Sequence, residues 1–201
     1  MQYFVAGIDT DSGKTLVSAI LCEAFGFDYW KPVQAGFPTD SDTVKTLVPN
    51  VVVHPEAYVL NTPASPHAAA KIDGVTIDLK KIVLPQSKNG LVIEGAGGCL
   101  VPLNESDFVI DLIPQFSAQI ILVADLYLGS INHTLLTVQL LQNRKYPVKG
   151  IIFNGESNPE SERIILKHSG YPCLLRVAKE QHLTSETIKR YATQIKKNWN
   201  E

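Results

Sequence analysis

The sequence predicts a doubly wound α/β domain built on a mostly parallel sheet, and three observations support this. Apolar runs of strand length alternate with helical patterns along the chain. Several runs, such as 119–124 and 148–153, are continuously apolar, which is typical of strands buried on both faces. A glycine-flanked loop ending in Gly-Lys-Thr joins the first run to the first helical pattern. We therefore expect a sheet of about seven strands in a single domain over residues 1–201, with ligands at the carboxyl ends of the strands.

Strands and helices are expected to follow one another in order. The expected strands are 3–8, 28–33, 90–94, 119–124, 148–153 and 172–177, with a weaker run at 51–53 or 57–60. The expected helices are 14–25, about 42–48, 78–83, 107–113, 131–143, 159–168 and 184–198. Gly26 suits the C-terminal cap of the first helix, Pro159 suits the first turn of another, and Ser130 could cap a third. The proline-rich stretches 32–41 and 61–67 are expected to be loops.

Composition narrows the class of protein. The chain has 45% hydrophobic and 19% charged residues, which are ordinary values for a globular protein. A net charge of −2 and the lack of any run of like charges give no indication of nucleic-acid binding. Three widely spaced cysteines argue against a zinc site or a disulfide framework, and no apolar run is long enough to span a bilayer. We expect a soluble, cytoplasmic protein with no membrane partner.

The loop from Gly7 to Thr15 predicts a phosphate-binding P-loop. Backbone N–H groups in such a loop point inward, and the following helix N-terminus adds partial positive charge. Lys14 would reach the β- and γ-phosphates, and the Thr15 hydroxyl would hold Mg²⁺. The usual spacing has four residues between the glycines, whereas here Ile8 to Ser12 make five.

Other chemistry-bearing residues follow the later strands. Lys31 stands at a strand end before a proline, where a rigid loop could aim it into the site. Asp40 and Asp42 could cap a helix, or one of them could bind a metal. Glu94 ends an apolar strand in the manner of a Walker B acid, and the glycines after it would let backbone N–H groups approach an anion. Asn154 could read a purine or cap a turn.

Taken together, five segments resemble the dethiobiotin synthetase family. They are the five-spaced P-loop at 7–15, Lys-Pro-Val-Gln-Ala-Gly at 31–36, Ser-Pro-His at 65–67, Glu-Gly-Ala-Gly-Gly at 94–98 and Leu-Gly-Ser-Ile-Asn-His at 128–133. The resemblance implies a homodimeric, ATP-dependent cyclo-ligase that acts on 7,8-diaminononanoate and CO₂ with Mg²⁺. It implies a carbamate whose oxygen attacks the γ-phosphate, followed by ring closure through a carbamic–phosphoric anhydride.

The resemblance also implies residue roles. Lys31 and Lys14 would be the catalytic lysines, and Thr15, Asp42 and Glu94 would contact magnesium. The nucleotide would bind Asp11, Ser12, Gly13, Lys14, Thr15, Leu16, Asp42, Glu94, Gly95, Ala96, Gly97 and Asn154. The substrate would bind Ala35 and Gly98, and its carboxylate end would meet Gly129 and Asn132 of a partner subunit.

Some positions depart from the family pattern. Ala35 stands where Ser or Thr is common, Gly155 follows Asn154 where an acidic residue is common, and the segment 174–180 lacks the usual Leu-Gly-x-x-Pro pattern. The last two departures leave the choice of nucleotide base open.

Alternative functions share the predicted fold. A ParA/MinD-like ATPase of protein placement would carry a lysine five residues before Lys14, but Asp9 stands there. Membrane-binding members of that group end in a basic amphipathic helix; here we expect the apolar stripe of 184–198 to pack on the core instead. An amidotransferase-type cobyrinate synthase would need a further glutaminase domain. An inactive nucleotide-binding relative is the non-enzymatic alternative.

Overall fold

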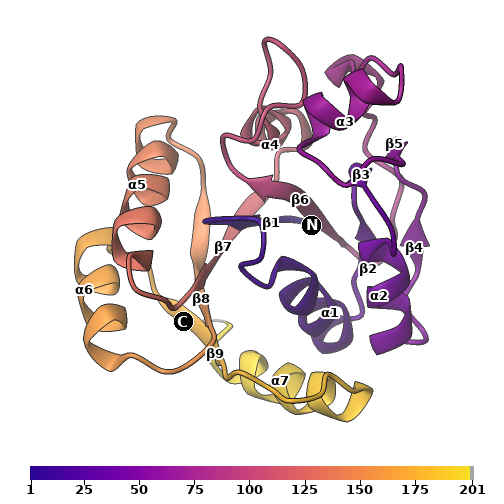
Figure 1. The fold of residues 1–201 in the computed structure, drawn as a ribbon. Coiled ribbons are helices and arrows are strands. Elements are labelled where there is room, and N and C mark those ends of the chain that lie inside the picture. Colours follow the sequence, from indigo (N-terminus) through magenta and orange to yellow (C-terminus); the bar gives the residue numbers. More distant parts are fainter. Residues whose placement is uncertain (200–201) are drawn as a thin grey trace.

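Three layers form the structure, a computed structural model that describes residues 1–199, with a sheet between two layers of helices (Figure 1). Every pairing in the central seven-stranded sheet is parallel. In spatial order its strands are β4 (Val53–His54), β2 (Asp28–Trp30), β6 (Leu91–Gly98), β1 (Gln2–Gly7), β7 (Gln119–Asp125), β8 (Val148–Asn154) and β9 (Cys173–Val177). The predicted doubly wound α/β fold is confirmed.

A small second sheet and the helices complete the architecture. The second sheet pairs β3 (Val33–Ala35) with β5 (Tyr58–Leu60) in parallel. The α-helices are α1 (Lys14–Phe25), α2 (Asp40–Leu47), α3 (Pro66–Ile72), α4 (Leu112–Phe116), α5 (Ser130–Asn143), α6 (Pro159–Ser169) and α7 (Ser185–Asn198). Single 3-10 turns lie at η1 (Leu79–Lys81) and η2 (Val109–Asp111).

Alternate residues of each strand face opposite helix layers. On β1, Phe4 and Ala6 join a core cluster with residues of α4, α5 and α6. Tyr3 and Val5 join a second cluster with residues of α1, α2 and α7. Both faces of the sheet are therefore buried, which is why the strands are continuously apolar in sequence.

Helix α7 packs against the second of these clusters. Ile188, Tyr191 and Ile195 are buried, and the Trp199 ring meets the Tyr3 ring edge-on with the centroids 5.1 Å apart. The prediction that this apolar stripe packs on the core is confirmed. None of the helices within residues 1–199 is both long enough and apolar enough to cross a membrane.

The predicted single strand 28–33 is wrong, because the chain leaves the sheet at Lys31. β2 ends at Trp30, and β3 begins at Val33 in the other sheet. Pro32 has no N–H to donate to a ladder, so a strand cannot pair regularly through it. The break turns Lys31 out of the sheet and toward Glu94 of β6.

The predicted strand 90–94 is too short, and Glu94 does not end it. β6 continues to Gly98, pairing Val5 with Glu94 and Gly7 with Gly98. A step of two residues along β1 thus spans four residues of β6, which forms a bulge between Glu94 and Gly98. A left-handed glycine at Gly97, with φ of 70°, permits this bulge.

Several helix boundaries also differ from the prediction. The pattern at 78–83 forms only a 3-10 turn, and 107–113 divides into a 3-10 turn and the start of α4. The expected loop 61–67 ends early because Pro66 opens α3, a first-turn position that suits proline. Ser130 is the first residue of α5 rather than its cap, which is the left-handed Gly129. Gly26 and Pro159 occupy the cap and first-turn positions that were expected.

Candidate active site

The P-loop connects β1 to α1 at the point where the strand order reverses. Its lysine lies over the loop: Lys14 Nζ donates to the carbonyl oxygens of Asp9, at 2.8 Å, and Thr10, at 2.7 Å. Ser12 Oγ donates to the same Asp9 oxygen at 3.0 Å. Burial lowers the pKa of Lys14. The loop therefore holds a lysine ammonium on its own carbonyl groups, at the N-terminus of a helix that favours anions.

Two glycines of the loop are required by close packing. Gly13 has a φ of 93°, and a Cβ there would lie 2.4 Å from Asn154 Nδ2. Asn154, at the end of β8, donates from that nitrogen to Ser12 O at 3.1 Å. A Cβ on Gly7 would lie 2.2 Å from Ser12 Oγ. Asn154 thus braces the P-loop, a contact that the sequence did not predict.

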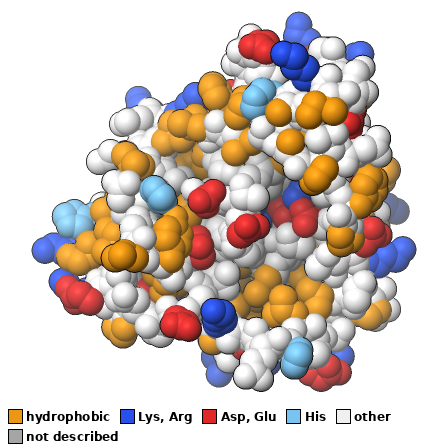
Figure 2. Space-filling model, in the orientation of Figure 1, with side chains coloured by type: hydrophobic (Ala, Val, Ile, Leu, Met, Phe, Trp, Pro, Cys, Tyr) orange, Lys and Arg blue, Asp and Glu red, His pale blue; other side chains and the backbone are white. Residues whose placement is uncertain are grey.

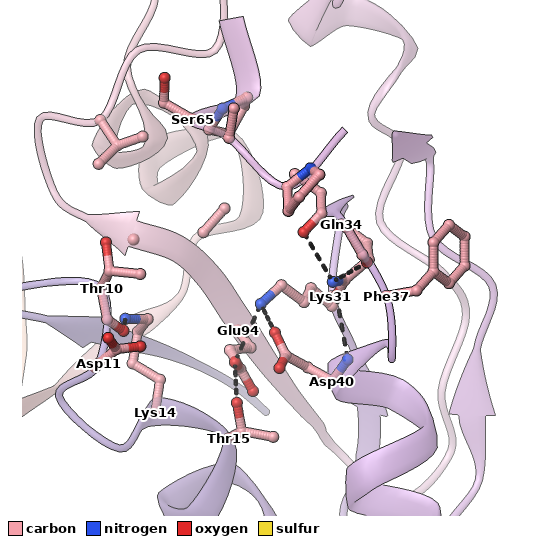
Figure 3. Close-up of a pocket in the computed structure, with 18 of the residues that line it drawn as sticks. Thr10, Asp11, Lys14, Thr15, Lys31, Gln34, Phe37, Asp40, Ser65 and Glu94 are labelled. Carbon is pink, nitrogen blue, oxygen red and sulfur yellow. Dashed lines mark hydrogen bonds and ion pairs between the residues drawn. The ribbon is translucent and has the colours of Figure 1, made fainter. Parts of the chain in front are cut away.

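Glu94 is the centre of the hydrogen-bond network beside the P-loop. Its carboxylate is almost fully buried and accepts bonds from three side chains, one on α1, one on β2 and one just after β2. Thr15 Oγ1 donates to Oε1 at 2.8 Å, Tyr29 Oη donates to Oε2 at 2.9 Å, and Lys31 Nζ lies 3.3 Å from Oε1. The structure therefore brings together the three predicted residues Thr15, Lys31 and Glu94 (Figure 3).

Lys31 also forms an ion pair with Asp40, the first residue of α2. Burial would lower the pKa of Lys31, but the carboxylates of Glu94 and Asp40 outweigh burial and raise it. Lys31 is therefore a buried ammonium between two carboxylates, at the edge of the cavity that the P-loop borders.

Asp42 is not brought together with these residues. Its carboxylate accepts a hydrogen bond from Thr39 Oγ1 at 2.7 Å, and Thr39 in turn accepts one from the Asp42 N–H at 3.0 Å. This exchange caps α2, and Asp42 is exposed outside the cavity. The acidic residue of this helix that lines the cavity is Asp40, which lies two residues before Asp42 and therefore on another side of the helix. The magnesium role of Asp42 stays a prediction, and the position of its carboxylate outside the cavity does not favour it.

A cavity of about 660 Å³ joins these groups to an apolar wall. In the space-filling view, acidic side chains gather around a central hollow that hydrophobic side chains border (Figure 2). The cavity is lined by Thr10, Asp11, Gly13, Lys14, Thr15, Lys31, Gln34, Ala35, Gly36, Phe37, Pro38, Asp40, Pro63, Ala64, Ser65, Pro66, Glu94, Ala96, Gly97 and Val101. Both charged and apolar side chains line the cavity, so a ligand with a polar head and a hydrocarbon part would fit.

The remaining predicted residues divide between this cavity and other places. Asp11, Gly13, Ala35, Ala96 and Gly97 line it, whereas Ser12 is buried within the P-loop. Leu16 faces the core from α1, and Gly98 pairs with Gly7 in the sheet. A Cβ on Gly95 would meet Phe4 and Val109, so Gly95 packs inward.

Two predicted substrate contacts lie away from the main cavity. Gly129 borders a separate cavity of about 290 Å³ between the starts of α5 and α6, and Asn132 is exposed on α5. A further cavity, of about 520 Å³, follows Asn154 and is lined by Gly155, Glu156 and residues 178–181. Gly155 and the segment 174–180 depart from the family pattern and left the choice of nucleotide base open, and both contribute residues to this one cavity.

Sequence reasoning missed Tyr29 and Gln34 and did not decide between Asp40 and Asp42. Tyr29 lies in an apolar run and gave no polar signal; only the pairing of β2 with β6 brings its hydroxyl to Glu94. Asp40 was visible beside Asp42, but the spacing did not show which one faces the cavity. Gln34 belongs to the Lys-Pro-Val-Gln-Ala-Gly segment and is buried. Its side chain donates a hydrogen bond to Gly36 O and accepts one from the Asp40 N–H, on either side of the loop that follows β3.

The parallel α/β/α fold and the P-loop after its central strand define a P-loop nucleotide-binding protein. Residues 1–187 match a family model described as an AAA domain. The MinC:MinD cell division protein complex of Aquifex aeolicus has a similar structure, with a TM-score of 0.60 and 14% identity, covering 99% of this chain and 94% of that one. A ParA family ATPase from Chlorobium tepidum gives a TM-score of 0.58 at 13% identity, covering 96% and 98%. At such identities these likenesses concern the fold alone.

Sequence relatives identify the family within this class. An ATP-dependent dethiobiotin synthetase BioD of Cytophaga hutchinsonii is 58% identical over 100% of this chain and 99% of its own. The protein of the same name from Christiangramia forsetii is 46% identical over 98% and 96%. The chain belongs to the family of ATP-dependent dethiobiotin synthetases.

Proposed function

We propose that this protein makes dethiobiotin from 7,8-diaminononanoate, CO₂ and Mg-ATP. The observation that carries the proposal is the composition of the main cavity, where a P-loop, a buried ammonium and a buried carboxylate meet an apolar wall. A diamine on a hydrocarbon chain has matching chemistry. Named dethiobiotin synthetases between 43% and 58% identical support the same activity.

The reaction needs positioned charge more than a protein nucleophile. The substrate amine adds to CO₂ and loses a proton to form a carbamate. A carbamate oxygen attacks the γ-phosphorus of ATP, ADP leaves, and a carbamic–phosphoric anhydride remains. The second amine attacks the carbonyl carbon, closes the ureido ring and expels phosphate. Phosphoryl transfer of this kind depends on neutralising charge and aligning the reactants in line.

Lys14 and Lys31 are suited to supply that charge. Lys14 Nζ donates to two P-loop carbonyl oxygens, and the same ammonium can donate to phosphate oxygens that enter the loop. Lys31 borders the same cavity from the end of β2, where it would meet the carbamate or the γ-phosphate. Fixed cations in a buried site stabilise negative charge that develops in the transition state.

The donor set beside the P-loop fits Mg²⁺. Thr15 and Glu94 present a hydroxyl and a carboxylate oxygen 2.8 Å apart, and Mg²⁺ prefers hard oxygen ligands completed by phosphate and water. Residues 1–199 contain no group of three or more His, Cys, Asp and Glu side chains that could hold a metal without such help. We infer that Thr15 and Glu94 would hold the ion with the nucleotide, whose phosphate charge it would neutralise.

A homodimer would complete the substrate site. Gly129 and Asn132 lie outside the main cavity, and Leu128 beside them is fully exposed. We propose that they bind the substrate carboxylate in the partner's site.

Mixing inactive Lys31→Ala protein with Asn132→Ala protein tests this proposal. Activity should be restored through hybrid dimers, which contain one intact site. If light scattering shows that the mixture forms dimers but no activity returns, shared sites are contradicted.

The proposed location is the cytoplasm. All three cysteines are free thiols, two of them buried. Burial raises the pKa of the Cys99 thiol to about 12, which makes it unreactive. Unpaired cysteines are usual where the compartment is reducing.

The decisive experiment is a product assay with several nucleotides. Purified protein is incubated with diaminononanoate, bicarbonate and Mg²⁺, with ATP, CTP or GTP in parallel, and dethiobiotin is measured by mass spectrometry. We expect dethiobiotin and phosphate in equal amounts with ATP. Absence of dethiobiotin at saturating diamine with all three nucleotides would contradict the proposed function.

Replacing Lys31 tests its role in that reaction. Lys31→Ala should abolish turnover while the circular dichroism spectrum stays that of the folded protein. Lys45→Ala, an exposed lysine on α2, is the matched control and should retain activity. A Lys31→Ala rate near that of the unmodified protein would show that the assigned role is wrong.

A further inference from the structure

Asp40 occupies an unusual place for an acidic residue in the first turn of a helix. Such residues commonly cap the helix or interact with its dipole. In α2 the cap is already provided by Thr39, whose hydroxyl accepts the Asp42 N–H at 3.0 Å. The Asp40 carboxylate instead faces the cavity and pairs with Lys31 Nζ (Figure 3). Capping therefore does not explain its position.

The backbone of Asp40 is held by a buried side chain. Its N–H donates to Gln34 Oε1 at 3.2 Å, while Gln34 Nε2 donates to Gly36 O at 3.0 Å. Gln34 is buried, so these bonds are shielded from water. Gln34 thus ties the end of β3 to the start of α2 and fixes where the Asp40 carboxylate can lie.

The other carboxylate near Lys31 already has several partners. Glu94 Oε1 accepts from Thr15 at 2.8 Å, and Lys31 lies farther from the same oxygen, at 3.3 Å. A cation bound by Thr15 and Glu94 would repel the Lys31 ammonium, since two positive charges would share one oxygen. Asp40 is then the carboxylate that can retain Lys31 at the cavity edge. Without Asp40, Lys31 would compete with the cation for Glu94.

We propose that Asp40 is a positioning residue that holds the Lys31 ammonium beside the cavity and away from the metal position at Glu94, with Gln34 fixing Asp40. The proposal rests on the proposed Mg-ATP site, but not on which product that site makes. It predicts a specific coupling: loss of Asp40 should impair magnesium-dependent nucleotide binding only while Lys31 is present.

The test measures ATP binding by calorimetry over a series of Mg²⁺ concentrations, without diamine or CO₂, so no turnover is needed. Asp40→Ala should raise the Mg²⁺ concentration for half-maximal binding at least about fivefold, the lower end of typical coupling between neighbouring sites. Asp40→Asn, which keeps a hydrogen-bond acceptor without the charge, should give a smaller rise. Glu105→Gln, an exposed carboxylate outside the cavity, should give none.

The Lys31→Ala background separates positioning from other roles. There, adding Asp40→Ala should change the Mg²⁺ requirement by less than about twofold, because Asp40 has nothing left to position. An equal rise in both backgrounds would overturn the proposal and make Asp40 a direct metal ligand. An unchanged Mg²⁺ requirement in Asp40→Ala and Asp40→Asn would overturn it as well.

Activity gives a second readout in the same variants. Asp40→Ala should lower kcat for dethiobiotin formation at saturating Mg²⁺ while KM for ATP stays within about twofold, because the nucleotide cradle is intact. If Asp40→Ala does not fold, as judged by thermal unfolding, the isosteric Asp40→Asn variant decides by both measurements. Failure to make dethiobiotin would affect the proposed function alone, since the binding experiment does not depend on the product.

Discussion

Replacing Tyr29 with phenylalanine isolates the hydrogen bond between β2 and the buried carboxylate. The Tyr29 ring is fully buried, and its hydroxyl donates to Glu94 Oε2 at 2.9 Å. Within the described part of the chain Tyr29 is the one donor to that oxygen, because Thr15 and Lys31 both contact Oε1. Tyr29→Phe keeps the ring and removes only the hydroxyl, so the packing of the core is retained.

The expected cost follows from the charge and burial of the acceptor. A hydrogen bond to a charged group contributes about 1.5–3 kcal/mol, and Glu94 Oε2 would be left unsatisfied at a nearly water-free position. Because 1 kcal/mol shifts Tm by about 2–4 °C in a chain of this size, Tm should fall by roughly 3–12 °C.

The assays are thermal unfolding for Tm and urea unfolding for the free energy, both followed by circular dichroism at neutral pH with EDTA, which removes metal ions from both proteins. Tyr58→Phe is the matched control, because the Tyr58 hydroxyl accepts the Asp78 N–H at 3.1 Å and has only neutral backbone partners. We expect that control to cost about 0.5–1.5 kcal/mol. If Tyr29→Phe costs no more than Tyr58→Phe, the reasoning that a buried charge strengthens the Tyr29 bond is refuted.

Three other substitutions test the acid stability, the P-loop and the last helix. Burial would raise the pKa of Asp28, but hydrogen bonds from Ser87, Asn89 and His54 lower it. The ionised carboxylate therefore stabilises the fold above the ordinary aspartate pKa, and this stabilisation is lost as pH falls through the lowered value. Asp28→Asn should cost about 1.5 kcal/mol or more by urea unfolding at pH 7 and progressively less toward pH 3; a difference independent of pH would contradict this. Gly13→Ala should destabilise the fold by about 1–3 kcal/mol and weaken Mg-ATP binding in calorimetry, because of its positive φ and the contact with Asn154; unchanged binding would show that the loop tolerates a Cβ. Ile195→Ala should cost about 2–5 kcal/mol in urea if α7 packs on the core, and a loss below about 1 kcal/mol would argue against that packing.

The sequence by itself determined the local parts of this protein. The bounds of α1 follow from a helical pattern between Gly13 and Gly26, and Gly26 adopts the left-handed conformation that ends such a helix. Continuous apolar runs identified the buried parallel strands, and the P-loop was evident because all its groups lie within nine residues. Spacing and periodicity are local properties, so one sequence suffices to read them.

Only the tertiary structure decided how distant residues meet. The strand β6 continues past Glu94 through a bulge because it pairs with β1 as far as Gly98. The pairing of β2 with β6 brings Tyr29 to a residue 65 positions away. The choice between Asp40 and Asp42 depended on which side of α2 faces the cavity, which the packing of that helix sets. Register, strand order and helix orientation are fixed by burial summed over the whole core, and no local pattern encodes them.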